Sequence, residues 1–171
     1  VGSRCADALT DGHQNVFVGD FAGSTTTSVG FATVVGHGAM GSGNVTADAD
    51  GTVAIGSLAL EDLTSGRYNT AIGYQALSAE DDGDKNTAVG YKALKAQTGT
   101  SGDVNNTAVG YHAGLAITTG VSNTAIGESA MSDLVEGDNN IAIGKAAMGG
   151  AMDATADASV GNVFIGKDAG G

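Results

Sequence analysis

The sequence predicts an all-β protein built as a β-solenoid, a β-roll of about ten short coils stacked into one elongated unit. Three observations predict this fold. A nine-residue motif recurs along the chain, glycine-marked steps return at nearly constant intervals, and each motif opens with alternating β-branched residues. A coil of this length cannot bury an apolar face alone, so neighbouring coils must stack.

The motif is clearest over residues 69–77, which read NTAIGYQAL. Near copies are NTAVGYKAL from Asn86, NTAVGYHAG from Asn106, NTAIGESAM from Asn123 and NIAIGKAAM from Asn140. Weaker copies begin at Asn15, Thr33, Thr52 and Asn162. Stretches rich in Gly, Asp, Asn and Ser separate the copies and are typical of turns.

The glycine of each Val-Gly or Ile-Gly step marks one coil. These marker glycines are Gly2, Gly19, Gly36, Gly56, Gly73, Gly90, Gly110, Gly127, Gly144 and Gly166. Their spacings are 17, 17, 20, 17, 17, 20, 17, 17 and 22 residues, so every third connector is longer and a super-period of 54 residues results. We expect a single repeat domain over residues 1–171. Both ends fall inside repeats, which suggests a processed protein, a fragment or a stacking unit.

Each coil is interpreted as a short strand, a second short strand and a turn. Side chains alternate along a strand, so the Thr position shares a face with the following Ile or Val. Val and Ile replace Thr in other coils, which favours an inward-facing core ladder of Ile55, Ile72, Val89, Val109, Ile126 and Ile143. The opposite face carries a close-packing column that would admit a second sheet or a second chain: Ala54, Ala71, Ala88, Ala108, Ala125 and Ala142.

Two coils near the ends carry Phe17 and Phe164 in place of this alanine. Terminal repeats of solenoids are often atypical because one side has no partner. Both phenylalanines are therefore candidates for contacts between the ends of two units, and the alternative is that each ring closes the end of the core. Segments such as ALEDL could form a helical turn, but a glycine follows each within a few residues, which favours the all-β solenoid.

The charge balance disfavours two classes of partner. Seven Lys and Arg residues against 19 Asp and Glu give a net charge of -12, which repels nucleic acid and anionic lipid. No apolar run is long enough for a membrane span. The single cysteine excludes an internal disulfide.

No catalytic constellation is visible, so we do not expect an enzyme. His13, His37 and His112 are far apart and occupy different repeat positions, which favours surface histidines over a metal site. No cofactor is expected apart from calcium at the acidic turns, whose carboxylates are hard-oxygen ligands. The calcium candidates are Asp48, Asp50, Asp81, Asp82 and Asp84, but the sequence favours solvated turns over calcium sites because no known calcium-binding loop is completed.

Two short sequence matches indicate candidate glycosylation sites. Asn44 and Asn105 each stand two residues before a threonine, in the pattern of an N-glycosylation acceptor. The Ser and Thr run that contains Thr25, Thr26 and Thr27 is a candidate for O-linked sugar. Matches of this length also arise by chance.

At NTAIGYQAL and its copies, the chain resembles the head repeats of trimeric autotransporter adhesins and the repeat arrays of phage tail fibres and related surface fibres. The resemblance covers nearly all of the chain. It implies a β-roll that trimerises and attaches to a surface, receptor or glycan. The coils here are longer than the adhesin coils, and the 171 residues include no coiled-coil stalk.

We therefore expect a structural or adhesive component of an extracellular fibre or filament that assembles with copies of itself. The partner copies would form a homotrimer or an end-to-end filament. The alternative is an ice-binding or carbohydrate-binding β-solenoid. Ice binding requires a flat, water-facing array of Thr70, Thr87, Thr107 and Thr124, which the Val and Ile exchanges at that site disfavour.

Overall fold

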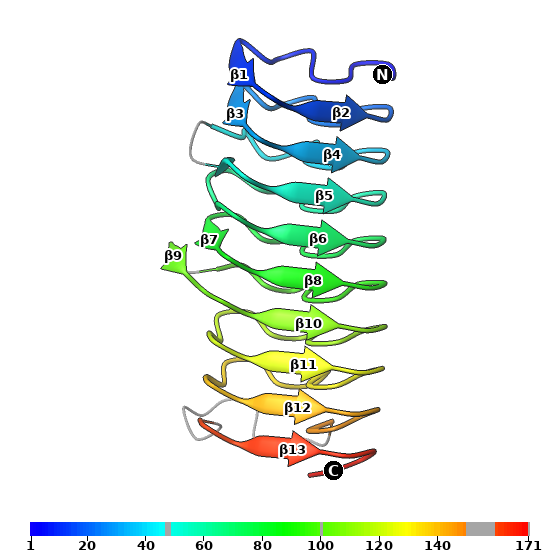
Figure 1. Ribbon diagram of the computed structural model, residues 1–171, viewed down its shortest axis with the longest axis vertical. Helices are drawn as coiled ribbons and strands as arrows, with labels where there is room; N and C mark the ends of the chain where they lie inside the picture. Colours follow the sequence, from blue (N-terminus) through cyan, green and yellow to red (C-terminus); the bar gives the residue numbers. More distant parts are fainter. Residues whose placement is uncertain (47–48, 100, 150–159, 171) are drawn as a thin grey trace.

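The computed structural model describes residues 1–46, 49–99, 101–149 and 160–170 and has the form of a tall stack of coils (Figure 1). Nine coils each contribute one three-residue strand to a single parallel sheet in the order β13-β12-β11-β10-β8-β6-β5-β4-β2. The strands are β2 (Val16–Val18), β4 (Thr33–Val35), β5 (Val53–Ile55), β6 (Thr70–Ile72), β8 (Thr87–Val89), β10 (Thr107–Val109), β11 (Thr124–Ile126), β12 (Ile141–Ile143) and β13 (Val163–Ile165).

All nine strands pair in register, so each residue lies over its counterpart in the next coil. Thr70 pairs with Thr87, and Ala71 pairs with Ala88. Two smaller parallel pairs join β1 (Asp11–His13) to β3 (Ser28–Gly30), and β7 (Gly83–Asp84) to β9 (Gly102–Asp103). The predicted β-solenoid is thus confirmed.

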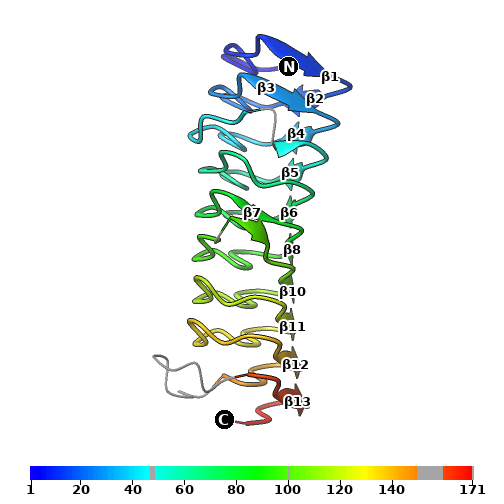
Figure 2. The ribbon, with the colours of Figure 1, turned by 90° about the vertical axis from the view of Figure 1, so that its left-hand side faces the viewer.

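The second strand that the sequence predicted at the Ala-Leu or Ala-Met pair of each coil is wrong; in the described residues, a second short strand occurs only later in four coils, as β1, β3, β7 and β9. The segment after each marker glycine forms successive turns that make a second layer behind the sheet, as the view turned by 90° shows (Figure 2). Its backbone groups also bond from coil to coil; for example, the Leu94 N–H donates to the Ala113 carbonyl at 3.0 Å. These turns need left-handed residues, including Lys92 with φ of 56° and Leu94 with φ of 49°, so the chain here cannot be a strand.

The marker glycines are required by both conformation and space. Gly90 has φ of 139°, and a Cβ on it would lie 2.3 Å from the carbonyl oxygen of Gly110, the next marker. Markers from Gly2 to Gly144 share this arrangement, with φ between 130° and 152°. Only glycine populates this backbone region readily. The recurrence of glycine at the marker position is therefore explained by the close approach between coils.

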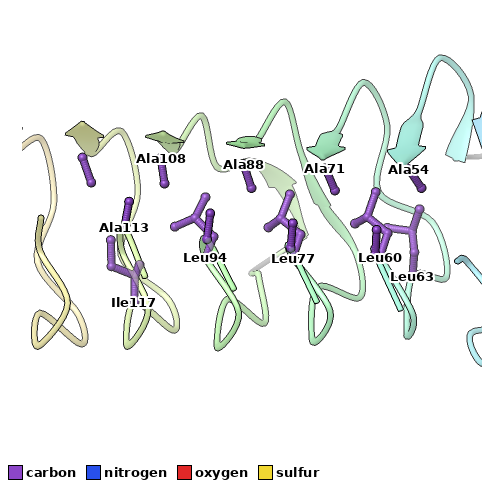
Figure 3. Close-up of a cluster of buried hydrophobic side chains, with 14 of the residues drawn as sticks. Ala54, Leu60, Leu63, Ala71, Leu77, Ala88, Leu94, Ala108, Ala113 and Ile117 are labelled. Atoms are coloured by element: carbon purple, nitrogen blue, oxygen red, sulfur yellow. The ribbon is translucent and has the colours of Figure 1, made fainter. Parts of the chain in front are cut away.

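The core lies between the sheet and the turn layer and is thin. Figure 3 shows the alanines of the strands directed toward the leucines of the turn layer, and both sets are fully buried. The Ala column therefore packs within its own chain and leaves no room for a second sheet or chain. In five of the six coils the residue six positions after the alanine is large; for example, Ala71 precedes Leu77, and Ala125 precedes Met131. The exception is Gly114 after Ala108, where Leu94 and Ile117 occupy the space beside the glycine.

The predicted core ladder is wrong, because its side chains lie on the outer face of the sheet. Ile55 and Val89 are half-buried there, and the remaining members are exposed: Ile72, Val109, Ile126 and Ile143. The physical reason is the size of the opposing residue. A small alanine on the strand complements a Leu or Met across the thin core, whereas an inward Ile would overfill it.

Phe17 and Phe164 show the opposite size match, in which the strand residue is large and the turn-layer residue is small. Where phenylalanine replaces the strand alanine, the residue six positions later is Gly23 or Gly170 instead of Leu or Met. A Cβ on either glycine would lie 2.3 Å from the phenylalanine ring. Both rings are partly buried against the core, so each fills the volume that Leu or Met fills elsewhere.

A ladder of buried asparagines runs along the edge of the core. The Oδ1 atom of each accepts the backbone N–H of the next, linking Asn69, Asn86, Asn106, Asn123, Asn140 and Asn162 at 2.8–3.0 Å. Several of the amide groups also donate to a turn carbonyl of the next coil, as from Asn123 Nδ2 to the Gly137 oxygen at 2.6 Å. These bonds satisfy buried polar atoms that would otherwise destabilise the fold.

We expect Gly90→Ala to lower the unfolding free energy by at least about 3 kcal/mol, because its Cβ would clash with a backbone that is held by both neighbouring coils. Urea unfolding followed by circular dichroism measures the loss. The control is Gly161→Asn, since Gly161 has open space and Asn105 and Asn139 occupy the same coil position with φ of 58°. Equal stability of Gly90→Ala and the native chain would contradict the proposed close approach.

Thr52 interrupts the asparagine ladder, and its buried hydroxyl has no hydrogen-bond partner among the described residues. We expect Thr52→Asn to raise the unfolding free energy by about 1 kcal/mol, because the new amide can donate to the Gly66 carbonyl and accept the Asn69 N–H. Thermal unfolding is the measurement. Asn123→Ala provides the opposite case and should lower stability by about 2 kcal/mol; a destabilised Thr52→Asn variant would show that the ladder cannot extend.

Candidate functional site

The outward face of the nine-stranded sheet is a regular surface that extends over all nine strands. We define the outer sheet face as the first and third residues of each strand. The first residues are Val16, Thr33, Val53, Thr70, Thr87, Thr107, Thr124, Ile141 and Val163, and the third are Val18, Val35, Ile55, Ile72, Val89, Val109, Ile126, Ile143 and Ile165. All are half-buried or exposed, and none carries a charge.

The composition of the outer sheet face is mainly aliphatic. Five positions hold threonine and the remaining thirteen hold valine or isoleucine. In mid-sheet, Val109 is 37% exposed and Ile126 is 38% exposed. The register places equal side chains side by side over many strands, so this face presents two straight columns of methyl groups with threonine hydroxyls interspersed.

The threonine column was expected to face inward, and this expectation is wrong. Thr70, Thr87, Thr107 and Thr124 are all half-buried on the outer sheet face. The exchange of Thr for Val or Ile in other coils therefore marks an outward position. Parallel strands accept β-branched residues on either face, so the exchange alone could not indicate the side.

Three stacked tyrosines occupy the residue after the marker glycine in consecutive coils. The Tyr74 and Tyr91 ring centroids are 5.5 Å apart, and those of Tyr91 and Tyr111 are 5.2 Å apart with nearly parallel planes. All three side chains are exposed. Sequence reasoning missed this stack, although the equal distance of each tyrosine from its marker glycine could have predicted it.

The three histidines lie in different settings. His13 packs edge-on against Phe31, and His37 lies near Phe21. His112 contacts Tyr111 at 4.0 Å between ring centroids, and its Nε2 is buried without a hydrogen-bond partner in the described chain. Desolvation, with a further contribution from the Lys92 ammonium, lowers the pKa of His112, so its imidazole is neutral at pH 7.

Three of the four calcium candidates that the structure describes accept hydrogen bonds from the protein. Asp50 accepts the Gly30 N–H, Asp81 accepts the Thr64 hydroxyl, and Asp84 accepts the Arg67 N–H. Asp82 lines a small pocket together with Arg67. Asp48 lies outside the described residues. Within the described ranges, no group of three or more His, Cys, Asp or Glu side chains could hold a metal ion.

The glycosylation candidates differ in accessibility. Asn44 and Asn105 are exposed, as an acceptor site requires. Thr26 is fully buried and therefore cannot carry a sugar in the folded chain. Thr25 and Thr27 donate hydrogen bonds to the carbonyls of Gly43 and Val45 in the next coil, so their hydroxyls have structural partners.

Glu80 is a buried carboxylate that sequence reasoning also missed. Its side chain is fully buried, its Oε1 accepts the N–H groups of Asp81 and Gly83, and its Oε2 accepts Asn86 Nδ2 at 3.2 Å. Burial raises the pKa of Glu80, while the two backbone N–H groups oppose that shift. Gln97 takes the corresponding place in the next coil and accepts Asn106 Nδ2 at 2.7 Å.

No protein-family model matches the chain, and no curated protein or solved structure matches it either. Within the part of the chain that the structure describes, no helix is long and apolar enough to cross a membrane.

We expect the stability difference between Glu80→Gln and the native chain to grow in favour of the variant as pH rises. A carboxyl with a raised pKa favours folding below its unfolded pKa, and this contribution is lost as pH rises through the folded pKa. Urea unfolding from about pH 4 to about pH 8 measures the difference. Glu136→Gln, at an exposed site, is the matched control, and a pH-independent difference for Glu80→Gln would contradict the expectation.

Proposed function

We propose that this chain is a structural and adhesive segment of an extracellular fibre and that it assembles laterally with copies of itself through the outer sheet face. The observation that carries the proposal is the uncharged, mainly aliphatic surface that runs over all nine strands. Eight strand-to-strand steps of about 4.8 Å make it about 38 Å long. Soluble monomers rarely expose a continuous apolar surface of this kind.

The parallel arrangement of the strands supports the same proposal. Sheets that are wholly parallel normally have both faces covered. Here the turn layer covers one face, and nothing in the described chain covers the other. A second copy would offer an equally straight pair of β-branched columns, and two such faces can interdigitate as in a β-sandwich.

Lateral assembly is favoured over end-to-end contact through Phe17 and Phe164. Both rings are used to fill the core beside Gly23 and Gly170, so they offer only part of their surface to another unit. If three copies surround an axis, as the resemblance implies, the Thr and Val/Ile columns face that axis. The Ala column is buried within each chain and cannot do so.

The location of the charges is consistent with a fibre that remains dispersed in water. The 18 positions of the outer sheet face carry no charge, so the net charge of -12 is carried by the rest of the chain. Repulsion between these acidic surfaces would oppose irregular aggregation while the uncharged face associates. Exposed turns would then be available to a surface receptor or a glycan.

Ice binding is the second candidate function, and the outward threonine column specifically favours it. Four threonines lie in register on the outer sheet face, as an ice-binding array requires: Thr70, Thr87, Thr107 and Thr124. The aliphatic majority of the face favours association between chains instead. The two functions make opposite demands, because ice binding needs the face to stay open to water.

We expect Val109→Lys to dissociate the assembly while leaving the coil folded. Val109 is partly exposed at mid-face, so a single chain tolerates lysine there, whereas an interface would bury an unpaired charge. Lysine also brings the net charge closer to zero, so general repulsion cannot explain dissociation. Sedimentation velocity measures the oligomeric state, and circular dichroism checks the fold.

The matched control is Val109→Thr, which keeps the β-branched shape and places a residue type already present on this face. This variant should keep most of the association. A native chain that sediments as a monomer at all accessible concentrations would contradict the proposed lateral assembly. Thermal hysteresis of such a monomer, abolished by Val109→Lys, would then establish the ice-binding alternative.

A further inference from the structure

A pocket on the turn layer carries features that self-assembly does not explain. It has a volume of about 470 Å³ and is lined by Ala79, Lys92, Lys95, Ala96, His112 and Leu115. This volume is in the range of small-molecule sites. None of the six residues belongs to the outer sheet face, so the pocket and the proposed interface are separate.

The lining residues come from three consecutive coils held together by backbone hydrogen bonds. The Lys92 N–H donates to the Tyr74 carbonyl at 2.9 Å, and the His112 N–H donates to the Tyr91 carbonyl at 3.0 Å. The Ala96 N–H donates to the Leu115 carbonyl at 3.3 Å. The backbone that carries the pocket residues is therefore fixed by hydrogen bonds between coils.

Lys92 and Lys95 differ from the other lysines of this acidic protein. Lys85, Lys145 and Lys167 each have a carboxylate oxygen within 2.6–3.3 Å. Lys92 and Lys95 have no carboxylate partner among the described residues, although 19 acidic residues are present in the chain. Both half-buried lysines line one pocket, which concentrates positive charge there.

The surroundings of Lys92 hold its side chain without neutralising its charge, and those of His112 leave one ring nitrogen without a partner among the described residues. The Lys92 ammonium lies 5.0 Å from the centroid of the Tyr91 ring, a contact that holds the side chain while keeping its charge. The buried Nε2 of His112 lacks a hydrogen-bond partner, which is unusual for a buried polar atom. The pocket thus combines two unpaired cations with one unsatisfied polar atom.

The remaining lining is apolar. Ala79, Ala96 and Leu115 contribute only methyl and aliphatic groups, and the lysine stems add to this surface. An inorganic anion would leave the apolar lining without a partner. A polyanion would also be repelled by the net charge of -12.

We propose that this pocket binds a small organic anion, with its carboxylate held by Lys92 and Lys95 and its nonpolar portion packed against Ala79, Ala96 and Leu115. The carboxylate supplies the counter-charge that both lysines lack. A free organic acid and a terminal acidic sugar with an acetamido methyl group share this chemistry. The site is independent of self-association, and the Val109→Lys variant should retain it.

The test uses the full chain and four probes: hexanoate, acetate, hexanamide and N-acetylneuraminic acid. Amide chemical shifts and calorimetry report the binding. Hexanoate should bind at least about tenfold more tightly than acetate, which lacks the nonpolar portion, and than hexanamide, which lacks the charge. Tighter binding of N-acetylneuraminic acid than of hexanoate would identify an acidic sugar, and the reverse order a free organic acid.

Matched variants locate the site. Lys92→Gln and Lys95→Ser should each weaken binding by about tenfold, and both are compatible with the fold because Gln75 and Ser78 hold these positions one coil earlier. Lys145→Ser removes an equal charge outside the pocket and should leave affinity unchanged. The proposal is overturned if hexanamide binds as well as hexanoate, if both pocket variants bind like the native chain, or if no probe binds.

Discussion

The close, in-register stacking of coils is the constraint on which the rest of the structure depends. At the marker glycines from Gly2 to Gly144, the next coil approaches so closely that a single Cβ would collide with its backbone. The asparagine ladder and the coil-to-coil hydrogen bonds then hold neighbouring coils at one separation. Because every coil obeys this separation, a residue at one coil position always lies beside its counterparts.

Stacking of this kind converts a position in the repeat into a column in space. The tyrosine stack, the asparagine ladder and the two columns of the outer sheet face are all consequences of this rule. Different side chains at one repeat position also become neighbours in space. Lys92 and His112 hold the same position in adjacent coils, which is why residues 20 apart in the sequence contribute to one pocket.

The sequence alone predicted the solenoid, its marker glycines and the extent of each repeat, because spacing and turn-forming residues determine these features. It did not predict which strand face is buried. Thr, Val and Ile suit both faces of a parallel sheet. The deciding information lies six residues away, where most coils match Ala with Leu or Met, and the two Phe coils match Phe with Gly. The turn layer was mistaken for a strand because left-handed Lys92 and Leu94 carry no sequence signal comparable to glycine. The pocket residues are brought together only when the coils are aligned in space. That Lys92 and Lys95 lack carboxylate partners among the described residues is visible only in the three-dimensional structure.

The buried polar pair of Glu80 and Gln97 has a consequence for folding. Solenoid contacts join residues about one coil apart, so folding can begin at many places and identical coils could pair one step out of register. In this column Glu80 and Gln97 lie between Leu63 and Ile117. A slip by one coil would set a buried carboxylate against an aliphatic neighbour without its Asn86 partner. Two adjacent polar residues flanked by aliphatic ones thus penalise misregistered stacking and favour a single order of the coils.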